Sequence, residues 1–279
     1  MAKIVSVLAL AHAPGVTGWL DRAPADEQKS ILAGYAAMAE QFNAAKPDVI
    51  VGIANDHLLN FPMESIPDFC VGINDRWSGP APWFRDWVNI PEYQVAGHRT
   101  LGRVLVREGA RRGVNFAYAE NLLFDDNWSV PLKFLTPKYD IPLVPIHMNC
   151  VVPPVPDSAK AFKVGQVLRE VIHSAFPGDA RVAIMATGGL SHDPGGKNYF
   201  LVDEAWDRWF IALMEAGDPE RIVRELTFER FLEGGDGGAS ELLAWLVAAG
   251  AAASPKGRSV FYVASPQQRC GLGGMLWDA

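Results

Sequence analysis

The sequence predicts a single α/β domain, residues 1–279, in which a mostly parallel central sheet is flanked by helices. Strand-like and helix-like segments alternate along the chain, which is typical of βαβ units with a parallel sheet. The connections are short, and no long linker, internal repeat or low-complexity segment divides the chain. A length of 279 residues and an apolar content of 49% are sufficient for one large core.

The predicted strands are short runs of apolar residues. The first run, "KIVSVLAL", resembles part of a signal peptide, but it continues into "HAPG" without a small-residue cleavage pattern. We therefore interpret it as the first strand of the fold. The predicted strands cover residues 3–10, 48–54, 115–120, 141–149, 181–189 and 258–265.

The predicted helices have apolar residues at helical spacing. In residues 26–45 this spacing places Tyr35 and Phe42 on one face. The region 60–95 is rich in proline and tryptophan, and we expect it to be irregular. The other predicted helices cover residues 95–113, 157–176, 203–216 and 240–252.

Composition excludes several classes of function. A net charge of −7 argues against general binding to nucleic acid, which requires a basic face. No stretch reaches the ~20 apolar residues that a membrane span needs, so we expect no membrane association. The three cysteines are odd in number and far apart, which argues against a disulfide framework or a zinc ribbon and favours a cytoplasmic location.

Histidines lie at or just beyond the ends of several predicted strands. His12, His57 and His192 follow three of them, and His147 lies near the end of a fourth. A single histidine at a strand end is commonly an ordinary polar residue. However, parallel strands place their carboxyl ends along one edge of the sheet, where these side chains can converge. Two imidazoles and one carboxylate form the ligand set that suits non-haem Fe(II).

The candidate carboxylate is Glu241, at the start of the apolar segment "SELLAWL". An acidic residue in the first turn of a helix is favoured by the helix dipole alone. Among so many apolar neighbours, however, a carboxylate is costly to bury unless a cation or hydrogen bonds compensate its charge. A metal ion would provide that compensation.

Four segments together resemble a known family. "LALAHAPG", "VGIANDHLLNFPMESIPDFCVG", "ATGGLSHDPGG" and "SELLAWL" are similar, in order and spacing, to class III extradiol ring-cleavage dioxygenases, the type of the protocatechuate 4,5-dioxygenase catalytic subunit. The resemblance runs from residue 3 to about residue 265. It implies an α/β fold, one Fe(II) ion, and insertion of both atoms of O2 into a catechol-like ring beside its two hydroxyls, as in the catabolism of aromatic compounds.

Matched position by position, the resemblance implies a role for each residue. His12, His57 and Glu241 correspond to the iron ligands. His192 corresponds to the catalytic acid–base residue, which is not a ligand. A neutral histidine beside the metal can take a proton from the substrate as it binds and return it later.

The chain departs from the family pattern in "LFDDNWSVPLKF". With Pro131 and Leu132 aligned, the histidine that contacts substrate in many relatives is replaced by Asp126. We expect Asp126 to act in catalysis or to bind the substrate, which could be an aminophenol or a hydroxypyridine as well as a catechol or a gallate. His147 either takes over part of the lost substrate-binding role or is a core residue of its strand.

Two other regions bear on the substrate and on partners. Arg269 falls where relatives hold a substrate carboxylate, and a guanidinium there favours an anionic substrate; alternatively, it is a solvated surface residue. The Trp-rich segment 75–93 could cover the pocket or form a subunit interface. We expect a small aromatic substrate and O2 as ligands, and a homo-oligomer; some relatives recruit a small companion subunit.

Two alternative functions use the same residues. A zinc hydrolase could use the His/His/Glu set to hold a metal-bound hydroxide. A non-enzymatic relative could keep the fold, since the central histidine of the family is absent. Oxygen uptake distinguishes the first alternative from a dioxygenase, and metal content tests the second.

Overall fold

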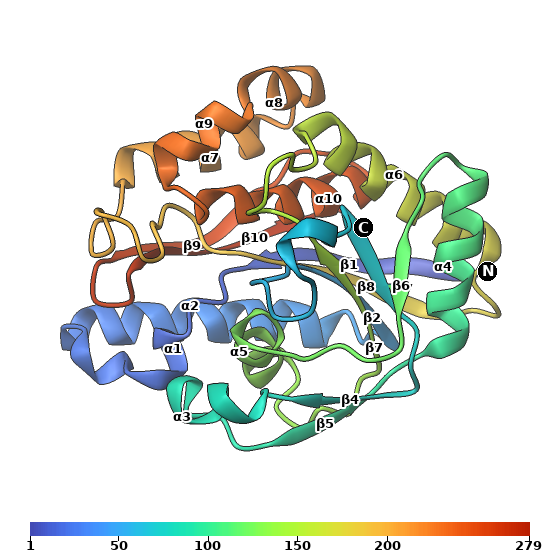
Figure 1. The fold of residues 1–279 in the computed structure, drawn as a ribbon, viewed down its shortest axis with the longest axis horizontal. Coiled ribbons are helices and arrows are strands. Elements are labelled where there is room, and N and C mark those ends of the chain that lie inside the picture. Colours follow the sequence, from blue (N-terminus) through green and yellow to red (C-terminus); the bar gives the residue numbers. More distant parts are fainter.

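An eight-stranded sheet forms the centre of the computed structural model, which describes residues 1–279 (Figure 1). The strand order is β6-β3-β7-β2-β8-β1-β10-β9, and the four central strands β7, β2, β8 and β1 are parallel. Strand β3 is antiparallel to β7, and β10 is antiparallel to both β1 and β9. The predicted α/β fold with a mostly parallel sheet is confirmed.

The strands and helices alternate along most of the chain. The strands are β1 (Lys3–Leu10), β2 (Val49–Asn55), β3 (Phe69–Gly72), β4 (Arg76–Gly79), β5 (Tyr93–Ala96), β6 (Ala117–Ala119), β7 (Leu143–Met148), β8 (Arg181–Thr187), β9 (Arg258–Ser265) and β10 (Cys270–Trp277). The α-helices are α1 (Gly15–Gly18), α2 (Ala25–Ala44), α3 (Arg85–Val88), α4 (Arg99–Arg111), α5 (Asp126–Leu135), α6 (Ser158–Ala175), α7 (Glu204–Ala216), α8 (Pro219–Glu225), α9 (Phe228–Gly234) and α10 (Leu243–Ala251). Short 3-10 helices are η1 (Leu20–Arg22), η2 (Met63–Ser65), η3 (Pro82–Phe84) and η4 (Ala239–Leu242).

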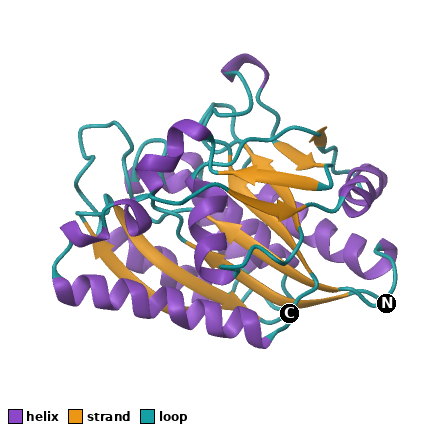
Figure 2. Cartoon of the chain, turned by 90° about the horizontal axis from the view of Figure 1, so that it is seen from below, coloured by secondary structure: helices purple, strands orange, loops and turns teal.

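Helices cover both faces of the sheet, as Figures 1 and 2 show. Helices α4, α6 and α10 pack on one face, and α2 and α5 pack on the other. Strand β2 lies between these two cores: Val51 and Ile53 face the first, and Ile50 and Ala54 face the second. A strand buried on both faces has a continuous apolar sequence, which is why this segment was easy to predict. None of the helices combines the length and apolar character needed to cross a membrane.

The structure corrects several predicted elements. The segment 60–95 is not wholly irregular, because β3 joins the main sheet and β4 pairs with β5 in a small second sheet. The predicted helix 95–113 begins only at Arg99, since β5 occupies its start. The glycine-rich tail was not predicted as a strand, yet β10 pairs with β1 in the interior of the sheet. Helix α5 was also missed, because it contains Pro131.

Helices α6 and α10 approach each other through two glycines. A Cβ atom on Gly165 would lie 2.0 Å from the carbonyl oxygen of Val247, and one on Gly250 would lie 2.1 Å from that of Phe162. Both clashes involve backbone atoms, which cannot move without separating the helices. The close contact matters for the site because α10 follows the turn that carries Glu241.

We expect the Gly165→Ala variant to lower the free energy of unfolding by about 1–3 kcal/mol, the usual cost of overpacking a core. Urea unfolding followed by circular dichroism would measure this loss. The control is Gln166→Ala, which changes the next, exposed residue of the same helix. Equal midpoints for wild type and Gly165→Ala would mean that the two helices are not locked at this contact.

Candidate active site

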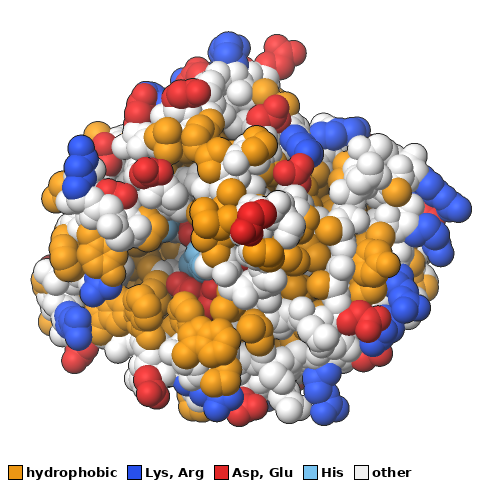
Figure 3. All heavy atoms as spheres, in the orientation of Figure 1, with side chains coloured by type: hydrophobic (Ala, Val, Ile, Leu, Met, Phe, Trp, Pro, Cys, Tyr) orange, Lys and Arg blue, Asp and Glu red, His pale blue; other side chains and the backbone are white.

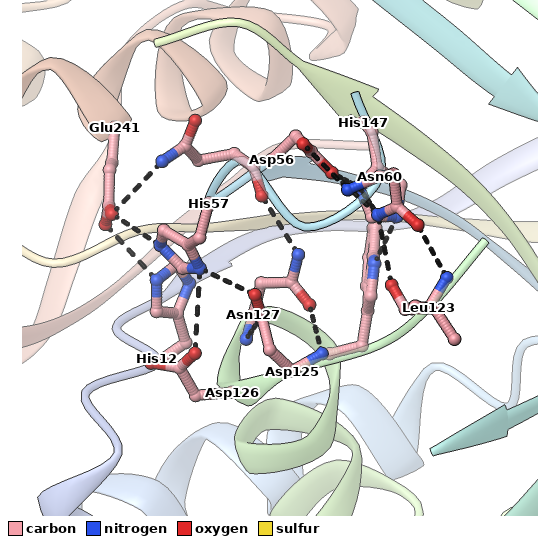
Figure 4. Close-up of polar contacts among 12 residues, drawn as sticks. His12, Asp56, His57, Asn60, Leu123, Asp125, Asp126, Asn127, His147 and Glu241 are labelled. Carbon is pink, nitrogen blue, oxygen red and sulfur yellow. Dashed lines mark hydrogen bonds and ion pairs between the residues drawn. The ribbon is translucent and has the colours of Figure 1, made fainter. Parts of the chain in front are cut away.

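The structure brings the three strand-end histidines together. His12 lies two residues beyond β1 and His57 two residues beyond β2, while His192 belongs to the loop after β8. Because β8 lies between β1 and β2 in the sheet, the three carboxyl ends are neighbours. The rings of His12 and His57 meet edge to face with centroids 5.2 Å apart (Figure 4). The convergence expected from the sheet edge is therefore observed.

Glu241 completes this group from the 3-10 turn before α10. Its Oε2 lies 3.2 Å from Nε2 of His12, and its Oε1 lies 2.9 Å from Nε2 of His57. Adjacent ligands that are each about 2.1 Å from a metal ion lie about 3 Å apart, so these distances suit ligands of a single ion. Glu241 and His12 are only 2% and 3% exposed, so their polar atoms depend on one another or on a cation.

A second set of contacts orients these three side chains. The Nδ1 atom of His12 lies 3.0 Å from the hydroxyl of Thr187, and Nδ1 of His57 lies 3.0 Å from a carboxylate oxygen of Asp125. Each ring therefore keeps Nε2 toward Glu241. The Oε2 atom of Glu241, which contacts His12, also accepts a hydrogen bond from the Gly189 amide at 3.0 Å. Metal-binding histidines commonly have such partners on the nitrogen that faces away from the ion.

The charges around His57 and Glu241 favour the binding of a positive charge at this site. Burial opposes a charge on His57, but Asp125 and Asp126 outweigh burial and hold its pKa well above the ordinary value. Burial would raise the pKa of Glu241, yet His12 and His192 hold it well below its usual range. Several carboxylates thus surround two imidazoles in a buried site, and a divalent cation would satisfy them more fully than shared protons.

Asp126 offers a second carboxylate close to the same histidines. Ligand atoms of His12, His57 and Asp126 lie within 4.8 Å of one another. However, the contact of Asp126 with His57 is 3.6 Å long and is made to Nδ1, the nitrogen that Asp125 also occupies. Burial and the charge of Asp125 raise the pKa of Asp126 to about 6. Glu241 touches the free Nε2 of both rings, so it is the better candidate ligand.

His192 is held with one nitrogen free. Its Nδ1 donates a hydrogen bond to the carbonyl oxygen of Leu190 at 2.7 Å, and its Nε2 points toward Glu241 at 3.7 Å. The preceding residue, Ser191, is fixed by buried Asp207, which accepts hydrogen bonds from the Ser191 amide at 2.6 Å and from its hydroxyl at 3.0 Å. The loop therefore holds the His192 imidazole in a fixed orientation near Glu241, but beyond hydrogen-bond distance from it.

The structure does not bring His147 into the site. Its side chain is fully buried, with Nδ1 3.1 Å from Asp56 and Nε2 accepting a hydrogen bond from the Trp128 indole at 2.9 Å (Figure 4). An indole nitrogen can only donate, so the proton of His147 must be on Nδ1, facing Asp56. With both nitrogens occupied in the core, the ring is unable to contact a substrate, and we do not retain it as a substrate-binding residue.

A cavity of about 490 Å³ opens over the histidines, and Asp126, His192 and Arg269 all line it. Figure 3 shows acidic and histidine atoms at the bottom of a hollow, with hydrophobic side chains around its mouth. The aromatic residues of the Trp-rich segment 75–93 lie in two different places. Phe84 and Trp87 line the cavity, whereas the Trp77 indole donates to a backbone carbonyl in the core.

Sequence reasoning missed Asp125, Thr187 and Gln268. Asp125 caps helix α5 by accepting a hydrogen bond from the Asn127 amide at 2.8 Å, and its acidic pair with Asp126 was the only sequence signal. Thr187 is the last residue of β8 and follows its apolar run, so its place at a strand end was the only sequence signal. Gln268 belongs to the connection between β9 and β10, whose existence depended on a strand that was not predicted.

We expect the Asp125→Asn variant to weaken divalent-metal binding by about 10–100-fold, the usual cost of losing the outer partner of a metal-binding histidine. Asparagine still caps a helix, so the change removes mainly the charge behind His57. Anaerobic titration calorimetry with Fe(II) would measure the affinity, with exposed Asp179→Asn as control. Unchanged affinity would show that the negative charge behind His57 is not needed for metal binding.

Comparisons with known proteins place the chain in a family. It belongs to the family described as the catalytic LigB subunit of aromatic ring-opening dioxygenase, which matches residues 6–269. The resemblance to extradiol ring-cleavage dioxygenases is thereby confirmed.

The relatives that the chain resembles are ring-cleaving enzymes. It is 28% identical over 172 residues to a 2,3-dihydroxyphenylpropionate/2,3-dihydroxicinnamic acid 1,2-dioxygenase of Photorhabdus laumondii, and 29% identical over 159 residues to a gallate dioxygenase of Pseudomonas putida. These matches cover 61% and 56% of this chain but only 51% and 46% of those proteins, about half their length. A relative of the first kind from Burkholderia vietnamiensis is 25% identical, with 95% of both chains covered.

A solved structure supports the fold. An uncharacterized protein from Escherichia coli K12 superposes with a TM-score of 0.64, covering 98% of this chain and 99% of that one. The two chains are 15% identical, so the likeness concerns the fold alone.

Proposed function

We propose that this protein is an Fe(II)-dependent extradiol-type dioxygenase that opens a catechol-like ring with insertion of both atoms of O2. One observation carries the proposal: at the floor of a cavity, the Nε2 atoms of His12 and His57 both contact the Glu241 carboxylate at 2.9–3.2 Å. Two imidazoles and one carboxylate on one side of an ion leave its other positions open, as Fe(II) oxygenases require. The family supports the same chemistry.

His12, His57 and Glu241 would hold the ion in this proposal. An Fe(II) ion held by these residues would supply the redox chemistry that joins O2 to the ring of the diol. Thr187 and Asp125 keep the Nε2 atoms facing the ion through their contacts with Nδ1. The burial of His12 and Glu241 strengthens the charge interactions in the site.

His192 would move the protons. Because Leu190 holds its Nδ1, the proton is accepted and returned at Nε2, which faces the ligand group. A catechol must lose a proton to bind through both oxygens, and a proton must be available when the ring opens. One oriented imidazole serves both steps.

Asp126 would contact the substrate from the side of His57. Its carboxylate lines the cavity and lies next to the histidine rather than between the two Nε2 atoms. There it can accept a hydrogen bond from a ring hydroxyl or from the N–H of an aminophenol or a hydroxypyridine. The reaction needs no external reductant, since the ring-opened product contains the atoms of substrate and O2 together.

The decisive experiment is O2 consumption by protein loaded anaerobically with Fe(II). The substrate panel contains catechol, gallate, dihydroxyphenylpropionate, an aminophenol and a dihydroxypyridine, because the relatives are named for gallate and dihydroxyphenylpropionate. We expect one O2 consumed per ring opened, with new absorbance from the product, for at least one compound.

Other outcomes separate the alternatives. Silence across the panel with iron bound would contradict the proposed activity on these rings. Turnover of an ester or amide by the zinc-loaded protein, without O2 uptake, would favour a hydrolase that uses the same ligands.

A further inference from the structure

Asp207 is a fully buried carboxylate on helix α7 that does not line the cavity. Its hydrogen-bond partners are Ser191 and Tyr262, neither of which is a cation. Burial raises the pKa of Asp207 to about 6, against the effect of these hydrogen bonds. An acid buried without a cation lowers stability, and proteins keep such costly groups mainly where function needs them.

The contacts of Asp207 connect two elements of the fold to the loop after β8. Its Oδ1 accepts a hydrogen bond from the Ser191 amide at 2.6 Å. Its Oδ2 accepts one from the Ser191 hydroxyl at 3.0 Å and another from the Tyr262 hydroxyl of β9 at 2.7 Å. Three donors fix the carboxylate, and two of them belong to the residue that precedes His192.

The Ser191 hydroxyl also joins the two ends of a longer segment. It accepts a hydrogen bond from the Asp203 amide at 2.8 Å while it donates to Asp207. Residues 192–202 lie between these two ends, and we call them the His192 loop. Pro194 and Tyr199 of this loop line the cavity together with His192. The loop therefore carries both the proposed acid–base residue and part of the cavity wall.

The backbone next to Ser191 determines how the imidazole is oriented. The Leu190 carbonyl accepts the hydrogen bond from Nδ1 of His192 at 2.7 Å. The Leu190 amide donates to the Gly271 carbonyl, and the Gly271 amide donates to the Ser191 carbonyl, both at 3.0 Å. The carbonyl that orients His192 thus belongs to a short stretch that is held by β10 on one side and by Asp207 on the other.

A different kind of contact limits His192 from the segment before η4. A Cβ atom on Gly235 would lie 1.8 Å from the carbonyl oxygen of His192, and one on Gly238 would lie 2.1 Å from it. Close backbone packing therefore blocks movement toward this segment. At Ser191 the loop is held by hydrogen bonds, and those to the Asp207 side chain are the ones that a substitution can remove.

We propose that Asp207 is a positioning residue for His192: through Ser191 it fixes the backbone that orients the imidazole and holds the two ends of the His192 loop together. Asp207 lies outside the cavity, so it acts on the reaction only through Ser191. This inference rests on the proposed function for the proton-moving role of His192.

The Asp207→Ala variant should keep its Fe(II) content and lose about 10–100-fold in kcat, because a reacting group displaced by about 1 Å can lose about 100-fold in rate. Steady-state O2 uptake and metal analysis on one preparation would measure both quantities. Glu204→Ala is the matched control, since Glu204 is an exposed acid of the same helix, and it should keep the wild-type kcat. Unchanged kcat in Asp207→Ala would overturn the proposal.

The His192→Gln background tests whether Asp207 acts through His192. Adding Asp207→Ala there should change the residual kcat by less than about 2-fold, because the effects of residues that act as a unit do not multiply. A general structural role of Asp207 would lower kcat by the same factor in both backgrounds. That result would overturn the proposal.

Trypsin cleavage after Lys197 measures the hold on the His192 loop without turnover. Lys197 is exposed and is the only lysine or arginine in the loop. We expect cleavage there to be at least about 10-fold faster in Asp207→Ala and in Ser191→Ala than in the wild type, because a protease cuts the locally opened form.

Ser191→Ala removes the hydroxyl that joins the loop ends and keeps the amide bond to Asp207. It therefore carries the kcat and trypsin measurements if Asp207→Ala does not fold. Faster cleavage in the variants, with no ring opened by the wild type, would refute the proposed activity and leave the hold on the loop supported. Ring opening by the wild type, with equal cleavage rates in every variant, would refute the role of Asp207 and leave the proposed function intact.

Discussion

The Glu241→Gln variant is expected to lose its metal ion and, with it, at least about 100-fold of its ring-cleaving activity. Glutamine has the same shape, but its neutral oxygen is a poor ligand and leaves two imidazoles without their shared anion. Removal of an outer partner alone typically costs about 10–100-fold in affinity or activity, and a direct ligand should cost no less. Metal content after anaerobic reconstitution and gel filtration, together with O2 uptake, would measure both effects.

Two further variants make this result specific. Glu40→Gln changes an exposed glutamate on α2 and should keep full metal content. Asp126→Asn tests the other carboxylate near His12 and His57. If Glu241→Gln kept its iron and Asp126→Asn lost it, the carboxylate ligand would be Asp126 and our assignment would be wrong.

The His192→Gln variant should keep its iron but lose roughly 10²–10⁴-fold in kcat, the contribution expected from a positioned acid–base group. Glutamine is unable to exchange a proton near neutral pH, whereas the ligand group of Glu241 and the two other histidines remains intact. Anaerobic metal analysis and steady-state O2 uptake on the same preparation would separate the two quantities.

His173→Gln provides the control, because His173 is a partly buried residue of α6 away from the cavity. Loss of iron from His192→Gln would instead identify His192 as a ligand. Unchanged kcat would transfer the proton-moving role to another group, such as Asp126, which also lines the cavity.

Much of the fold could be predicted because its central strands are buried on both faces and therefore have continuous apolar sequences. This is true of β1, β2, β7 and β8. The missed strand β10 contains three glycines in "CGLGGMLW", which carry no strand signal. They are needed there, because a Cβ atom on Gly271 would lie 2.1 Å from Asp207 and one on Gly274 would lie 2.7 Å from Phe261.

The candidate site was predictable where it follows from the sheet edge and less so where it depends on contacts across the fold. His12 and His57 follow strand ends, and Glu241 lies at the start of an apolar segment. The structure brings Glu241 into contact with both histidines. His147 also lies near a strand end, but its ring points into the core toward Trp128 rather than into the cavity. Sequence alone does not reveal the direction of a ring, because it is set by partners far along the chain.

The contact between His57 and Glu241 joins residues 184 positions apart. During synthesis at about 5–20 residues per second, the histidine would leave the ribosome roughly 10–40 s before the carboxylate does. Through that interval β1 and β2 can form, but the anion that draws their histidines together does not yet exist. If the proposed ion binds to this group, its full ligand set exists only after Glu241 has been synthesised, so the supply of the ion at that late stage would set how much of the protein becomes active.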